Sequence, residues 1–151
     1  MAYSNYSKPR GFDISRNANE PRVQVPTVDI GKMTAELFSD TASRAADACA
    51  AGRDTNKSTQ LRRFYDELVL WTDKVYAAKT PKEQDAKFTE LLPYIQMLRA
   101  KVAYARGRKL VDDNFKTLFD RLIQQVKSKE TLKTARLFME AFMGYKKCLE
   151  Q

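Results

Sequence analysis

Apolar side chains recur every three or four residues along most of the chain from Thr27 onward, a spacing that predicts amphipathic helices. The first predicted helix spans residues 29–51 and ends before Gly52, a residue type common after helix C-termini. The second begins at Ser58 or Thr59, which both suit an N-cap. The apolar stripes of these two helices consist of Ile30, Met33, Leu37, Ala45 and Cys49 in the first, and of Leu61, Phe64, Leu68, Trp71 and Val75 in the second.

Prolines mark the boundaries of the next helices. Residues 80–83 (Thr-Pro-Lys-Glu) form a capping-box pattern with Pro81 at the first helical position. The helix that begins there carries Phe88, Leu91 and Leu92, and Pro93 must end or kink it because proline lacks a backbone N–H. A fourth helix is predicted from Pro93 to about residue 106, a fifth over 112–127 and a last one from 129 to the end of the chain. Their expected buried positions are Ile95, Leu98, Val102 and Ala105, then Phe115, Leu118, Phe119, Leu122, Ile123 and Val126, then Leu132, Ala135, Phe138, Met139, Phe142, Tyr145 and Leu149.

The fold class follows from this pattern. No segment shows the alternation of a strand, so we expect an all-α protein, a single compact bundle of five to six helices over residues 27–151. Residues 1–26 hold three of the five prolines and have no apolar periodicity. They are therefore expected to form a flexible leader.

Residue types that are missing restrict the chemistry. The chain has no histidine, which removes Ser-His-Asp and Cys-His nucleophile activation and every metal site that needs an imidazole. No glycine-rich phosphate-binding motif occurs. Carboxylate-only metal sites stay open, although the acidic pairs at residues 66–67 and 112–113 are typical of helix-surface charge. We expect no enzyme activity, no cofactor and no resident metal.

The cysteines and the lengths of the apolar segments indicate in which cellular compartment the protein works. Cys49 and Cys148 lie far apart, each within a helical pattern, which favours two free thiols that pack as small core side chains, with a disulfide left open. No apolar run is long enough to span a bilayer, and the N-terminus lacks the apolar core of a secretory signal. The sequence thus predicts a cytoplasmic protein without a membrane partner.

The charge is uneven along the chain. Residues 1–56 carry seven basic and seven acidic side chains, whereas residues 57–151 carry twenty and twelve, which accounts for the whole net charge of +8. A basic body of this kind is typical of a protein with a polyanionic partner.

One basic cluster lies within the predicted fourth helix and just after its end. On a helical wheel its cations lie on both sides of the buried stripe, and a low-relief outer face with a single aromatic residue, Tyr104, lies between them. Such a face suits a phosphate backbone between two basic rims, with Tyr104 stacked on a base. Alternatively, the alanines of this face pack against another helix and the cations are solvated edges. The cations are Arg99, Lys101, Arg106, Arg108 and Lys109, and the outer face consists of Gln96, Ala100, Ala103 and Tyr104.

A second basic cluster lies at the start of the second helix. Lys57, Arg62 and Arg63 precede the first acid, Asp66, although the positive end of a helix dipole disfavours cations, each by about 0.3–1 kcal/mol. A phosphate bound there would meet free backbone N–H groups, two hydroxyls and the arginines. Surface arginines with screened charge are the alternative.

Three stretches together resemble one family. Residues 59–65 (TQLRRFY), 98–108 (LRAKVAYARGR) and 138–146 (FMEAFMGYK) are similar to three motifs of the small subunit of the type III-A CRISPR effector (Csm) complex. The likeness covers roughly residues 57–149. Gly144 and Lys146 depart from the family pattern, which more often has alanine and histidine there.

The resemblance implies a non-catalytic, RNA-binding bundle of about five helices. Copies of such subunits stack head-to-tail and contact the guide RNA and the single-stranded target RNA without reading sequence, beside the backbone and large subunits. The alternatives are the small subunit of a type III-B complex and an all-helical protein–protein scaffold with incidental basic charge. The residues expected to contact RNA are Lys57, Arg62, Arg63, Arg99, Lys101, Tyr104, Arg106, Arg108 and Lys109.

Overall fold

The computed structural model describes residues 24–150, and within that range the chain forms five α-helices and one short 3₁₀ helix without any strand. The predicted all-α bundle is therefore confirmed. Most of the predicted leader, residues 1–23, lies outside the described residues. Of the three leader residues that are described, 24–26, Pro26 is buried. In chain order the helices are η1 (Glu36–Phe38), α1 (Asp40–Ala48), α2 (Ser58–Tyr76), α3 (Pro81–Gly107), α4 (Asp113–Gln124) and α5 (Lys129–Leu149).

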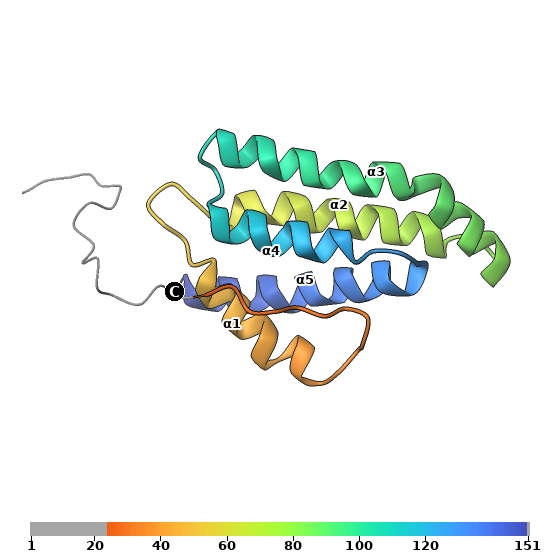
Figure 1. The fold of residues 1–151 in the computed structure, drawn as a ribbon, viewed down its shortest axis with the longest axis horizontal. Helices are drawn as coiled ribbons and strands as arrows, with labels where there is room; N and C mark the ends of the chain where they lie inside the picture. Colours follow the sequence, from red (N-terminus) through yellow and green to blue (C-terminus); the bar gives the residue numbers. More distant parts are fainter. Residues whose placement is uncertain (1–23, 151) are drawn as a thin grey trace, which may run out of the picture.

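The long helices lie side by side and α1 covers α5 (Figure 1). α5 packs against α1 and α2, α2 packs against α3, and α3 packs against α4. Four phenylalanine rings join α2, α4 and α5 in the core, with Phe115 of α4 at the centre. Its ring centroid lies 5.9 Å from that of Phe64, 5.6 Å from that of Phe119 and 6.0 Å from that of Phe142.

Local capping explains why three helices begin where they do. Thr80 Oγ1 accepts a hydrogen bond from the Glu83 N–H and Pro81 follows the cap, as predicted. Asp112 caps α4 by accepting from the Phe115 N–H. Ser128 and Thr131 cap the start of α5 reciprocally. These are contacts within one helical turn, so they form from the sequence alone.

The first predicted helix is wrong in its N-terminal part. The chain is not helical before Ala35, because long-range hydrogen bonds engage its backbone: the Gln125 side chain accepts from the Ile30 N–H and donates to the Val28 carbonyl. Ile30, Leu37, Ala45 and Cys49 are buried as predicted, whereas Met33 is 57% exposed. α1 ends at Ala48, and Gly52 lies in the loop that follows, where its N–H donates to the Thr55 carbonyl.

The two helices predicted on either side of Pro93 are one continuous helix, α3. Pro93 lies exposed inside it, and Figure 1 shows that the N-terminal part of α3 bends. A proline removes one backbone hydrogen bond and crowds the preceding turn, which bends a helix without ending it where its neighbours hold both halves.

The burial predictions for the last three helical segments hold except near the C-terminus. Tyr145 and Leu149 are 37% and 49% exposed, and Cys148 is exposed rather than in the core. Cys49 is a buried free thiol, as predicted, and burial raises its pKa. Trp71 of α2 is half-buried and packs at the edge of the core.

Candidate nucleic-acid interface

The two basic clusters, far apart in the sequence, lie at the same end of the bundle. α2 and α3 run antiparallel, so the start of α2 is next to the end of α3 (Figure 1). The Asn56 N–H donates to the Leu110 carbonyl at 2.9 Å, and the Thr55 hydroxyl donates to the Lys109 carbonyl at 3.3 Å. These bonds join the segment before α2 to the segment after α3.

Four of the predicted RNA contacts form ion pairs. Arg62 pairs with Asp66 at 3.7 Å within α2, while Lys101 of α3 reaches Glu67 of α2 at 3.0 Å. Arg99 lies 3.5 Å from Asp120 of α4. Arg106 donates to Asp113, and this hydrogen bond lowers the pKa of that carboxyl.

The four pairs differ in how open they are to solvent, since Asp120 and Glu67, the partners of Arg99 and Lys101, are only 20% and 29% exposed. The side chains of Arg62 and Asp66 are 67% and 60% exposed, and such surface pairs stabilise a fold by about 0–1 kcal/mol. Exchange of the Asp66 carboxylate for a phosphate at Arg62 therefore costs little free energy.

Four other predicted contacts, Lys57, Arg63, Arg108 and Lys109, have no ion pair among residues 24–150, and all four are exposed. We call these four the unpaired cations. The Arg108 guanidinium donates to the Tyr104 hydroxyl at 3.0 Å and lies 5.8 Å from the centroid of its ring. Lys109 has a positive φ of 64°, which turns the chain sharply after α3.

The outer face of α3 is uncovered. Ala100 and Ala103 are exposed and Tyr104 is 66% exposed, so within the described residues no other helix packs on this face. Gln96 is the exception to the prediction. It is half-buried and donates to the Ile123 carbonyl of α4 at 3.2 Å, so it belongs to the α3–α4 contact.

The predicted anion site at the start of α2 holds an anion of the chain itself. The Glu150 carboxylate accepts from the Ser58 N–H at 3.2 Å and from the Ser58 hydroxyl, and these bonds lower its pKa. Lys57 takes the N-cap position, and neither Ser58 nor Thr59 caps the helix with its side chain, contrary to prediction. Sequence reasoning missed Glu150, because this residue lies 92 positions from Ser58.

A buried lysine, Lys146, lies beside the Glu150 carboxylate. We call Lys146, Glu150, Asn56 and Ser58 together the C-terminal lock. Lys146 is 0% exposed, and its Nζ donates to the Asn56 carbonyl at 2.8 Å and lies 3.5 Å from Glu150 Oε2. Asn56 is fully buried at a positive φ of 58°, and its side chain accepts from the Asp112 N–H. The position of Lys146, four residues after Phe142 on the apolar stripe, is the signal that predicts its burial.

A family model described as Csm2 Type III-A matches residues 32–151, which include all five α-helices. The chain belongs to this family. No curated protein and no solved structure matches it significantly. As a Csm2 family member the protein is the small subunit of a type III-A Csm effector complex, in which it works with other subunits, and the family is one of non-catalytic subunits.

Two further properties of the described residues bear on its role. No group of three or more acidic or cysteine side chains in residues 24–150 is arranged to hold a metal ion. None of the described helices of this Csm2 family member is both long and apolar enough to cross a membrane.

Proposed function

We propose that this Csm2-family subunit binds single-stranded RNA, guide or target, without reading its sequence, through the end of the bundle where α2 begins and α3 ends. The observation that carries the proposal is the convergence of the unpaired cations there. They come from two segments of the chain and have no acid to neutralise them among the described residues. Phosphate groups are the partners that such a surface fits.

The other predicted contacts have a secondary role in this proposal. Arg62, Arg99, Lys101 and Arg106 exchange their carboxylate partners for phosphates, and Tyr104 stacks on a base between them. Lys146 takes no part, since it is buried in the C-terminal lock.

We also propose that copies of the subunit stack head-to-tail along the RNA, beside the backbone and large subunits, in the cytoplasm. Membership of the family and the resemblance of residues 57–149 support this part. No cleavage step is assigned to this chain.

The unpaired cations give a direct test. In the double variant Arg63→Ala/Arg108→Ala, the affinity for a labelled oligouridylate, followed by fluorescence anisotropy, should fall. The slope of log affinity against log salt should become shallower by about 1.4, that is about 0.7 for each lost phosphate contact.

A matched control keeps the net charge of that variant. Lys82 and Lys127 are exposed and belong to the opposite end of the bundle (Figure 1). The double variant Lys82→Ala/Lys127→Ala should retain the affinity and the salt slope. Equal losses in both double variants would show that net charge alone attracts RNA, and an unchanged affinity in the first would favour the protein scaffold.

A further inference from the structure

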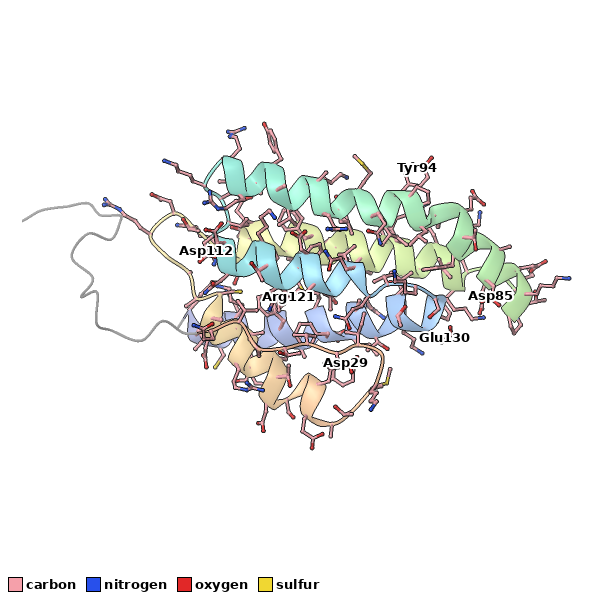
Figure 2. All side chains as sticks on the ribbon, viewed as in Figure 1. Asp29, Asp85, Tyr94, Asp112, Arg121 and Glu130 are labelled. Carbon is pink, nitrogen blue, oxygen red and sulfur yellow. The ribbon has the colours of Figure 1, made fainter. Side chains whose placement is uncertain are left out.

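An aromatic pair lies partly exposed between α2 and α3, away from the cation-rich end. Tyr94, labelled in Figure 2, projects from α3, and its ring stacks on that of Trp71 of α2. The ring centroids are 5.6 Å apart and the planes differ by 23°. Tyr94 is 55% exposed, so one ring of a stacked pair remains available to a third ring.

This pair lines a hollow with a basic rim. Trp71, Lys74, Lys87, Glu90, Leu91 and Tyr94 surround a space of about 510 Å³. Lys87 lies 3.4 Å from Glu90, while Lys74 has no ion pair among residues 24–150, which leaves the rim with one excess positive charge. The indole Nε1–H of Trp71 is buried without an acceptor in the described chain.

The hollow lies on the same two helices, α2 and α3, as the surface proposed to bind RNA. Along one face of α3, cationic and aromatic residues recur from the hollow to the end of the helix, with the exposed side chains of Glu90 and Met97 among them. At 1.5 Å per residue, the ten positions from Tyr94 to Tyr104 span about 15 Å along the helix axis. The cationic and aromatic residues of this face are Lys87, Tyr94, Lys101 and Tyr104, and Arg108 comes directly after the helix.

The side of α2 that faces α3 also carries cationic and aromatic residues. Arg63, Glu67, Trp71 and Lys74 follow one another at helical spacing, and the ion pair between Glu67 and Lys101 shows that the two helix faces meet. Cations beside exposed aromatic rings are the combination that single-stranded nucleic acids require. The cores of protein–protein interfaces, in contrast, are depleted in lysine, and two lysines line this hollow.

We propose that Trp71 and Tyr94 form a second RNA contact, where an unpaired base stacks on Tyr94 while the adjoining phosphates lie near Lys74 and Lys87. This site rests on the proposed function, since the same strand occupies the unpaired cations and then follows α3 to the hollow.

The single tryptophan of the chain makes the site directly observable, because all tryptophan emission comes from Trp71. The full-length protein is titrated with oligouridylate and, in parallel, with inorganic polyphosphate, which has the charge of a backbone but no bases. Oligouridylate should quench the emission of Trp71. Polyphosphate should compete for the unpaired cations without quenching.

Variants of Tyr94 separate stacking from charge. Tyr94→Ala should weaken oligouridylate binding by about tenfold and abolish the quenching, because one base–aromatic stack is lost. The salt slope should stay unchanged, since no cation is removed. Tyr94→Phe keeps the ring and should retain both affinity and quenching. The control Tyr145→Ala removes a tyrosine that is 37% exposed on α5 and should change neither.

The outcomes distinguish failure of this site from failure of the proposed function. If oligouridylate binds and Arg63→Ala/Arg108→Ala weakens it, but Trp71 emission and the Tyr94→Ala affinity do not change, the stacking site is wrong and the cation surface stands. If Tyr94→Ala retains RNA affinity and loses assembly with other Csm subunits, the hollow is a protein-docking surface. Absence of any RNA binding rejects both proposals.

Discussion

The C-terminal lock and the cation-rich end of the bundle use the same residue types for different purposes. Lys146 is 0% exposed and its ammonium is held by the Asn56 carbonyl and the Glu150 carboxylate. Arg63 is exposed and has no ion pair among the described residues. A buried cation requires partners within the fold, because its desolvation is costly. An exposed cation without a carboxylate neighbour is free to meet a ligand. Burial and partners, more than charge itself, separate a structural lysine from a binding arginine.

The largest effect is expected at Lys146. The variant Lys146→Ala leaves the Asn56 carbonyl without this donor, removes a buried four-carbon stem and takes away the cation beside Glu150. Together these losses should lower the free energy of unfolding by about 3 kcal/mol. Urea denaturation followed by the helical circular dichroism signal measures this change.

Its neighbour provides the control. Lys147 is exposed, and Lys147→Ala should change the free energy of unfolding by less than about 0.5 kcal/mol. If both variants unfold at the same urea concentration as the wild-type protein, the lock does not stabilise the fold.

A smaller and pH-dependent effect is expected at Glu150. Glu150→Gln removes the negative charge of the group that accepts hydrogen bonds from Ser58 at the start of α2. It should lower the free energy of unfolding by about 1 kcal/mol at pH 7. The Ser58 hydrogen bonds lower the pKa of Glu150 from its ordinary value of 4.5, so its carboxylate stabilises the fold above about pH 4.5. This contribution is lost as the pH falls through the lowered pKa.

The wild-type protein and Glu150→Gln should therefore differ in melting temperature at pH 7 and converge in strong acid. Glu140→Gln, which changes an exposed acid of the same helix, should follow the wild-type curve at each pH. A difference between wild type and Glu150→Gln that persists unchanged in acid would mean that the ionised carboxylate is not the cause.

The smallest expected effect is the difference in RNA binding between variants of two neighbouring arginines on α2. Arg63→Ala removes an unpaired cation and should make the salt slope of RNA binding shallower by about 0.7. Arg62→Ala removes a cation that must first leave Asp66, so its effect on the affinity should be smaller. Anisotropy titrations at several salt concentrations measure both, and a larger loss for Arg62→Ala would reverse the order that the ion pairs predict.

The sequence predicted the helices whose signals are local. α2, α4 and α5 follow apolar stripes at helical spacing, and Thr80, Asp112 and Ser128 cap their helices within one turn. The errors lie where distant groups intervene. Residues 29–35 are not helical because Gln125 engages the backbone of Val28 and Ile30. The break expected at Pro93 is a bend, since α3 has buried core residues on both sides of it, Phe88 and Leu91 before and Ile95 and Leu98 after.

For the candidate site, the residue types and their clusters were visible in the sequence, whereas their availability was not. The 3.6-residue periodicity and the three motifs of residues 57–149 were sufficient for an all-α member of the Csm2 family, because both depend on neighbours along the chain. Tertiary structure alone decided that Lys101 meets Glu67, that Arg99 meets Asp120 and that Glu150 reaches Ser58. Electrostatic pairing depends on distance in space, and packing brings these groups together from different helices.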